Sequence, residues 1–179
     1  MDRVYPAPTL LGRFMDDLLP WPTSDRAYLV LDLHPGYALM TAPLVTRPCL
    51  IVTRNRCPLY LKDLWRCQPE GIIAFSNTYN LEQIAQALAK VAAGKRVCIG
   101  LPPDNTGLTA RERDIARLAA LGRDDPEIAR ELHITEKTVR NLFPGILLKM
   151  GLKNRVQLSH YYLGILPVFP GGPPAGTGY

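Results

Sequence analysis

Short apolar runs alternate with helical patterns along the first hundred residues. Three such runs, at residues 28–31, 49–52 and 71–75, are typical of strands buried on both faces of a parallel sheet. Residues 59–67 predict a helix between the second and third strands. A further helix is predicted after the third strand, capped by Asn80 and ended by Gly94. Its apolar stripe consists of Leu81, Ile84, Leu88 and Val91. This order of strands and helices predicts an α/β unit with a parallel sheet.

The pattern after residue 107 is helical throughout. Thr109 caps a helix that runs to about residue 120, and Glu112 completes a capping box. A short second helix starts at residues 125–127, where Pro126 occupies a position that needs no N–H donor. The third helix follows Thr135 after a tight turn, and a fourth covers residues 155–163. Two helices joined by a tight turn, the second with exposed basic residues, are what a helix-turn-helix requires.

Proline and glycine mark the boundaries between these parts. Residues 100–107 show neither the helical nor the strand pattern of apolar residues, and we predict a linker there. Residues 165–179 contain no charged side chain and predict a flexible Pro/Gly tail. We therefore divide the chain into an α/β domain (1–99), a linker, an all-α domain of four helices (108–164) and a tail.

The helical part resembles the LuxR/NarL-type, or GerE-like, helix-turn-helix of bacterial transcription regulators. The resemblance covers residues 108–163 and combines many positions at fixed spacing, which makes it specific. The residues that carry it are Leu108, Thr109, Arg111, Glu112 and Arg113, then Glu127, Ile128, Ala129, Leu132, Ile134, Thr135, Thr138 and Val139, then Ile146, Lys149, Met150, Gly151, Leu152 and Arg155.

The resemblance implies that the third helix enters the major groove of double-stranded DNA. Arg140 and Asn141 would then face base edges, with chemistry suited to guanine and adenine. Thr135, Lys137 and Thr138 would lie near phosphates and position the helix. Lys149 and Lys153 would extend the basic face, and Arg155 either joins them or serves as a structural charge.

Some residues depart from the family pattern. Pro144 lies inside the third helix, removes a donor to the Arg140 carbonyl and predicts a kink. Asp124 and Asp125 begin the second helix, where acidic groups repel DNA unless they serve as caps. These departures, with Phe143 in the third helix, keep an alternative open. The chain would then be a degenerate regulator that acts as a protein-interaction module with weak or no DNA binding.

The first part of the chain resembles a shortened, atypical receiver domain, a truncated flavodoxin-like fold. Residues 29–36 are similar to the receiver's phospho-acceptor strand and turn, which makes Asp32 the candidate phospho-acceptor. Thr53 matches the receiver's switch hydroxyl. The receiver's lysine position falls at or near Phe75, and Asp16-Asp17 lies in a helix-like stretch instead of at a strand end. Because charge on the transferred group would go uncompensated, we expect control that does not depend on phosphorylation of Asp32.

Composition excludes several classes of protein. The chain has 179 residues, 47% of them hydrophobic and 21% charged, with no apolar run of the roughly 20 residues that span a bilayer. The first residues lack the apolar region of a secretory signal. The cysteines (Cys49, Cys57, Cys67 and Cys98) form no CxxC pair, so we expect no metal site or disulfide framework and a reducing cytoplasm as the setting.

These observations converge on a cytoplasmic transcription regulator of the response-regulator class. A net charge of +5 is compatible with binding to nucleic acid. We expect a homodimer on double-stranded DNA. Another regulatory protein is a candidate partner that would control it. We expect no membrane partner and no cofactor. No nucleophile–base pair or phosphate-binding glycine loop suggests an enzyme. Dimer contacts are expected from residues 157–163 or from the receiver-like domain.

Overall fold

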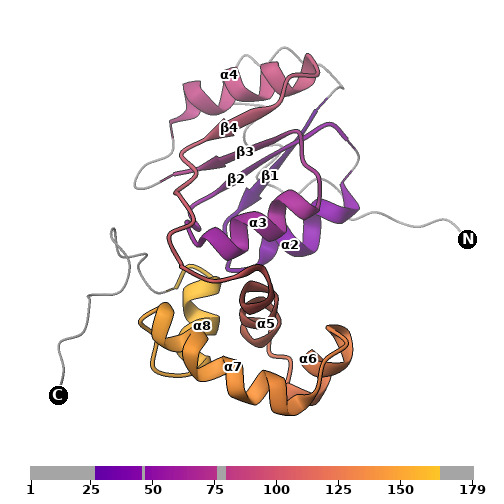
Figure 1. Cartoon of the computed structure of the whole chain (residues 1–179). Helices are drawn as coiled ribbons and strands as arrows, with labels where there is room; N and C mark the ends of the chain where they lie inside the picture. The colour runs from indigo at the N-terminus through magenta and orange to yellow at the C-terminus, as the bar shows by residue number, and fades with distance from the viewer. Residues whose placement is uncertain (1–26, 46, 76–79, 166–179) are drawn as a thin grey trace, which may run out of the picture.

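Four parallel strands form the sheet of the N-terminal part (Figure 1). The structure is a computed structural model that describes residues 27–45, 47–75 and 80–165. The strands are β1 (Tyr28–Asp32), β2 (Cys49–Thr53), β3 (Gly71–Ala74) and β4 (Val97–Ile99), in the order β1-β2-β3-β4. In this register Asp32 lies beside Thr53, and Thr53 lies beside Ala74. The predicted parallel α/β unit is confirmed, and β4 is an additional strand.

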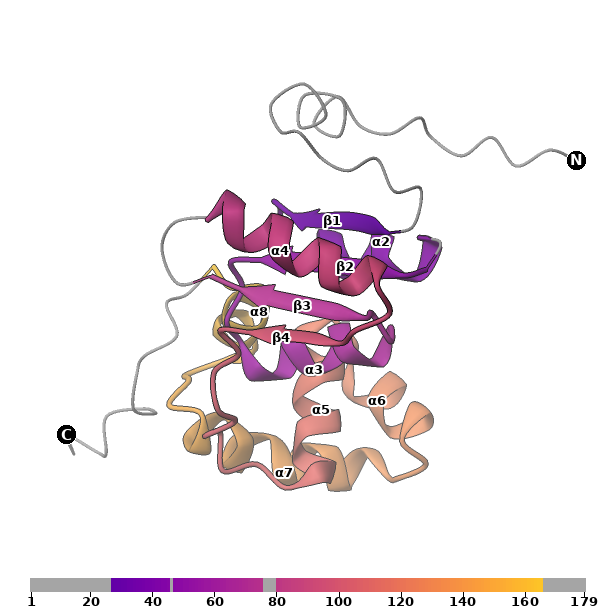
Figure 2. The ribbon, with the colours of Figure 1, turned by 90° about the horizontal axis from the view of Figure 1, so that it is seen from above.

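Helices cover both faces of this sheet. We call the sheet and these helices together the sheet unit. Helices α2 (Tyr37–Thr41) and α3 (Pro58–Arg66) lie on one face, with the short 3-10 helix η1 (Ala42–Leu44). Helix α4 (Leu81–Ala92) covers the other face (Figure 2). The Asn80 side chain caps α4 by accepting from the Gln83 amide. Because all five residues of β2 are buried, its continuous apolar run is explained by packing on both faces.

Four helices form the helical unit, as the apolar periodicity predicts. They are α5 (Ala110–Ala120), α6 (Asp125–Glu131), α7 (Glu136–Lys149) and α8 (Arg155–Tyr162). Thr109 and Glu112 form a capping box at the start of α5, and Asp124 and Glu127 form one at α6. Such caps satisfy N–H groups that the first turn of a helix leaves without partners.

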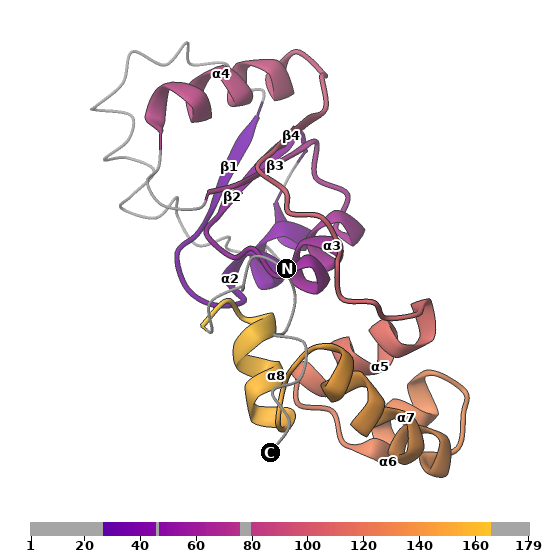
Figure 3. The ribbon, with the colours of Figure 1, turned by 60° about the vertical axis from the view of Figure 1, so that its left-hand side comes forward.

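One hydrophobic core extends from the sheet into the helical unit. It contains Ile51 and Ile72 of the sheet, Leu64 of α3, and Ile115 and Leu158 of the helical unit. Helix α3 lies between the sheet and helices α5 and α8 (Figures 1 and 3). At this boundary the rings of Tyr60 and Tyr162 meet edge to face, with 5.5 Å between centroids. The two units therefore bury apolar surface against each other.

Several predicted features fall outside the described residues. They are the helix-like stretch at residues 10–19 with Asp16 and Asp17, and the tail from residue 166 onward. Within the part of the chain that the structure describes, no helix is long and apolar enough to cross a membrane.

Candidate nucleic-acid interface

Helix α7 is presented by the short helix α6 and the turn that follows it. The turn contains His133 with φ 54°, a left-handed conformation that reverses the chain within a few residues. Thr135 then caps α7, and its hydroxyl accepts from the Thr138 amide at 3.1 Å. Val139 and Ile146 are fully buried and fix which side of α7 faces the core. The opposite side is therefore held outward.

The outward side of α7 begins with polar residues. Lys137, Arg140 and Asn141 are exposed there, close together on successive turns. The Thr135 and Thr138 hydroxyls lie 2.9 Å apart. Arg140 pairs with Glu136 at 3.2 Å, but both side chains are more than half exposed. Such a pair contributes little, about 0–1 kcal/mol, so Arg140 can exchange it for another acceptor at small cost.

Two residues predicted for the basic face are engaged inside the helical unit instead. The Lys149 ammonium donates to both Glu112 carboxylate oxygens at 2.8 Å and so joins α7 to α5. Arg155 donates to the Arg123 carbonyl at 2.6 Å and to the Asp125 carboxylate at 2.5 Å. Its guanidinium also lies 4.7 Å from the centroid of the Phe143 ring. These contacts favour the structural role for Arg155, whereas the Lys153 side chain is exposed and has no ion pair among the described residues.

The two acidic residues at the start of α6 also have structural partners. The Asp124 side chain accepts from the Glu127 amide at 2.8 Å, as a helix cap does. Asp125 accepts from Arg155. Both carboxylates are therefore neutralised or hydrogen-bonded locally, which lessens the repulsion of DNA that their position suggests.

The second half of the outward side of α7 is apolar. Helix α7 continues through Pro144, so the helix is not broken there. Pro144 and Gly145 are exposed, and Leu148 is 80% exposed. A groove contact would consequently depend on the first two turns of α7, where the polar side chains are.

Few basic groups of the helical unit are free of acidic partners. Of the ten Lys and Arg residues between positions 105 and 164, six take part in ion pairs. The four without an ion pair among the described residues are Arg111, Arg130, Lys137 and Lys153. Arg111 and Arg130 are exposed cations that the sequence analysis did not single out for DNA, because a lone basic residue on a helix has no distinguishing pattern.

Asp32 occupies a closed, buried position at the end of β1. One carboxylate oxygen accepts from the Ala38 amide at 2.9 Å. The other accepts from the Thr53 hydroxyl at 2.7 Å and from the Tyr60 hydroxyl at 2.8 Å. Burial, reinforced by the Asp32 charge, raises the pKa of Tyr60 far above its usual range, so this hydroxyl stays a donor. No cluster of His, Cys, Asp or Glu that could hold a metal ion occurs among the described residues.

Comparison with known proteins assigns the helical unit to a family. The sequence profile described as "Bacterial regulatory proteins, luxR family" matches residues 106–162. The spore germination protein GerE of Bacillus subtilis is 46% identical over 50 residues, which cover 28% of this chain and 68% of GerE. This chain belongs to the LuxR family of bacterial regulatory proteins.

Longer relatives in the LuxR family are matched only in part. The uncharacterized transcriptional regulatory protein YvfU of Bacillus subtilis is 38% identical over 132 residues, or 71% of this chain and 64% of YvfU. The nitrate/nitrite response regulator protein NarL of Escherichia coli is 39% identical over 94 residues, or 44% of each chain. This chain thus spans less than two thirds of these relatives' length.

Solved structures of a further regulator show a loose overall similarity. RcsB from Salmonella enterica serovar Typhimurium, solved bound to a promoter in the presence of phosphomimetic BeF3-, is 20% identical. The match has a TM-score of 0.41 and covers 86% of this chain and 82% of that one.

Replacing Arg155 by alanine tests its structural role. The change removes hydrogen bonds that join α6 to α8 and the stacking on Phe143. We expect the free energy of unfolding to fall by about 1–3 kcal/mol, measured by urea denaturation. Lys153→Ala, two residues away and exposed, should change it by less than about 0.5 kcal/mol. Equal stability of the two variants would contradict the structural role.

The Glu112–Lys149 pair predicts a pH dependence. The Lys149 ammonium, helped by the Thr109 amide, lowers the pKa of Glu112 below its usual value. A carboxylate with a lowered pKa stabilises the fold above its unfolded-state pKa of about 4.3, and this contribution is lost as the pH falls through the lower folded value. Glu112→Gln should therefore reduce the free energy of unfolding at pH 7, with the difference shrinking below about pH 4.

Glu82→Gln provides the matched control for this pH series. Glu82 also lies in the first turn of its helix, but on the exposed part of α4 and without an ion pair among the described residues. Its effect on unfolding should be small throughout. A Glu112→Gln effect that is equally large at acidic and neutral pH would contradict the ion-pair explanation.

Proposed function

We propose that this chain is a sequence-specific DNA-binding transcription regulator that reads the major groove with α7. The observation that carries the proposal is the outward placement of Lys137, Arg140 and Asn141 on the first half of α7, with α6 behind it. LuxR-family membership supports the same function.

The chemistry of these side chains matches their proposed roles. An arginine guanidinium can donate two hydrogen bonds to guanine, and an asparagine amide can both donate to and accept from adenine. We assign base contacts to Arg140 and Asn141. Thr135, Lys137 and Thr138 lie around the start of α7, where hydroxyl, ammonium and backbone N–H groups suit phosphate oxygens.

A homodimer on an inverted repeat would place two α7 helices in successive major grooves. In α8, Leu158 and Tyr162 are fully buried within the chain, which limits what residues 157–163 can offer a second copy. The sheet unit presents large apolar side chains on β1, just after it, and on α2 and η1. Those exposed are Tyr28, Leu33, Tyr37, Met40 and Leu44. We favour pairing through this surface, because exposed apolar area of this kind is typical of interfaces.

We also propose that DNA binding is independent of phosphorylation at Asp32. Both of its oxygens already accept hydrogen bonds, and one accepts two. Phosphoryl transfer would require the carboxylate to give up these donors while buried, and among the described residues no metal-holding cluster and no lysine ion pair compensates the charge. The three donors support a structural role for Asp32 that joins β1 to β2, α2 and α3.

Selection of bound fragments from random duplex DNA tests the proposed DNA binding. The wild-type chain should enrich an inverted repeat, with affinity that falls as salt rises. Arg140→Ala should weaken binding to that repeat by about tenfold or more, because a bidentate base contact contributes about 1–3 kcal/mol. Arg96→Ala, an exposed arginine of the sheet unit, is the matched control and should leave the affinity unchanged.

The same selection can contradict the proposal. A folded protein that enriches no sequence would favour the protein-interaction module, for which the apolar half of α7 with Leu148 would be the candidate surface. Enrichment that survives Arg140→Ala unchanged would remove the proposed role of that residue.

Intact-mass measurement after incubation with acetyl phosphate and Mg²⁺ tests the second part of the proposal. We expect no gain of a phosphoryl group, because the Asp32 carboxylate is enclosed by donors. Asp32→Asn should lower stability while leaving the mass result unchanged. A phosphoryl group added to the wild type and absent from Asp32→Asn would overturn the argument that enclosure keeps Asp32 from being phosphorylated, on which the proposed independence rests.

A further inference from the structure

The end of α8 is seated on the sheet unit by buried polar contacts. Tyr162 is fully buried, and Asn55 and Asp63 are each only 7% exposed. The Asn55 side-chain amide donates to the Tyr162 backbone carbonyl at 2.9 Å. The Tyr162 hydroxyl donates to the Asp63 carboxylate at 2.5 Å. Both ends of one residue of the helical unit are therefore held by the sheet unit.

The partners of Asn55 and Asp63 are specific to this arrangement. The Asn55 side chain also accepts from the Cys57 amide at 2.9 Å, which fixes its orientation. Asp63 accepts from Arg66 at 2.9 Å, and Arg117 of α5 lies 3.7 Å away. A different packing of the same apolar surfaces would bury these groups without partners, which is unfavourable for buried polar groups. The polar contacts therefore select the one orientation in which the shared apolar core packs, so their loss should loosen the apolar contact as well.

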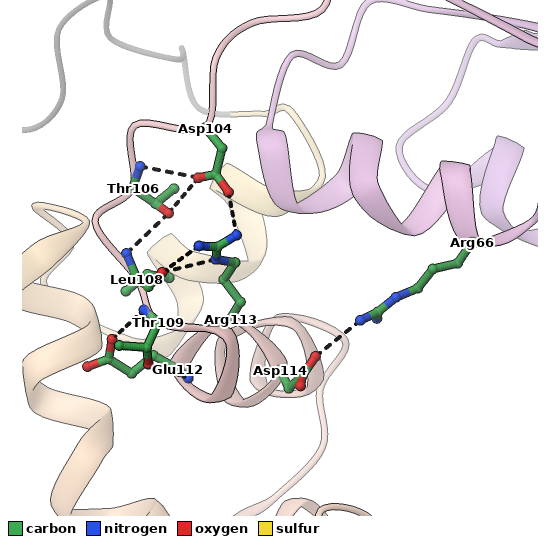
Figure 4. Close-up of polar contacts among 8 residues, drawn as sticks. All are labelled: Arg66, Asp104, Thr106, Leu108, Thr109, Glu112, Arg113 and Asp114. Carbon is green, nitrogen blue, oxygen red and sulfur yellow. Dashed lines mark hydrogen bonds and ion pairs between the residues drawn. The ribbon is translucent and has the colours of Figure 1, made fainter.

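The segment that connects the units is also fixed in place. Gly100 has φ +70°, and a β-carbon there would lie 2.1 Å from the Ala74 carbonyl oxygen, so only glycine fits. Asp104 pairs with Arg113 at 2.9 Å and accepts from the Thr106 hydroxyl, as Figure 4 shows. Arg66 of α3 reaches Asp114 of α5 at 3.2 Å, across the boundary between the units.

The outward side of α7 stays exposed to solvent while the two units are in contact. Helix α7 packs on α5 and α6, on the side of the helical unit away from the sheet (Figures 1 and 3). Lys137, Arg140 and Asn141 remain exposed while α8 is docked. The contact that holds the units together and the surface proposed to meet DNA are therefore separate.

We propose that Asn55, Asp63 and Tyr162 form a latch that fixes the helical unit in one orientation, and that α7 can bind DNA while the units are latched. The second half of this statement rests on the proposed function. The three latch residues are positioning residues, because they would act on DNA only through the direction in which α7 is held.

Rotational tumbling measured by ¹⁵N relaxation on the full chain tests the latch without DNA. The sheet unit and the helical unit of the wild type should share one correlation time. The variant Asn55→Ala with Tyr162→Phe should show two different and shorter correlation times. Tyr161→Phe is the matched control, because the neighbouring Tyr161 takes no part in the latch, and it should tumble as the wild type does.

A second variant tests the latch at an exposed position, in case the first variant does not fold. Asp114→Arg places two arginines opposite each other at the edge of the boundary, outside either core, and should also loosen the units. Asp114→Asn keeps the shape of the side chain without the repulsion, leaves the Arg66–Asp63 pair in place, and should retain a single correlation time. Independent tumbling of the units in the wild type would overturn the latch.

Binding to duplex DNA of the selected sequence completes the test. The latch variant should bind a single half-site within about threefold of the wild type, because α7 is exposed in both forms. Binding that becomes tenfold tighter would show that docking hides α7, and would overturn the assignment of the latched form. No binding by any variant, with tumbling as expected, would overturn the proposed function and the DNA half of this inference while leaving the latch supported.

Discussion

A carboxylate removed from water has to be given partners by the fold, and Asp63 receives its partners from both parts of the chain. Arg66 belongs to its own helix, whereas Tyr162 and Arg117 belong to the helical unit. Burial, together with this neighbouring charge, raises the pKa of Tyr162 far above its usual range, so its hydroxyl remains a donor to Asp63. The directional demand of this one group, set in a shared apolar core, accounts for the way α3, α5 and α8 meet.

The same physical rule connects this boundary to Asp32. Tyr60 donates its hydroxyl to Asp32 and presents its ring to Tyr162, so one side chain contacts both the end of β1 and the end of α8. The Thr53 hydroxyl donates to Asp32 and accepts from the Asn55 backbone N–H. The Asn55 side chain in turn donates to the Tyr162 carbonyl. Two short paths of contacts therefore lead from Asp32 to the helical unit.

Periodicity and caps were sufficient to predict most elements of the fold. Strands β1, β2 and β3, helices α3 and α4, and the four helices of the helical unit follow from apolar patterns and from caps such as Asn80 and Thr109, which are local properties. The short elements α2, η1 and β4 were not predicted, because α2 and η1 have no side-chain cap and β4 has only three residues.

The candidate interface was predictable where it depends on one helix and not where it depends on distant partners. Outward placement of Lys137 and Arg140 follows from the buried stripe of α7 itself. Lys149 and Arg155 carry the same charge, but their acceptors lie 37 and 30 residues away in sequence. Nothing local distinguishes a cation that will find such a partner from one that stays free. For the same reason, the contacts of Asn55 and Asp63 with Tyr162 have no signature in the sequence.

The burial of Tyr162 has a consequence for exchanging parts between relatives. Helical units of this kind invite grafting onto other α/β domains, as if each folded and functioned without its neighbour. In this chain the last residue of α8 fits a socket formed by Asn55, Tyr60 and Asp63. A helical unit transplanted without its matching α3 would expose an aromatic ring to water, and a foreign unit inserted here would leave a hole in the core of its host. The natural unit of exchange therefore begins upstream of the linker, at Asn55 just before α3.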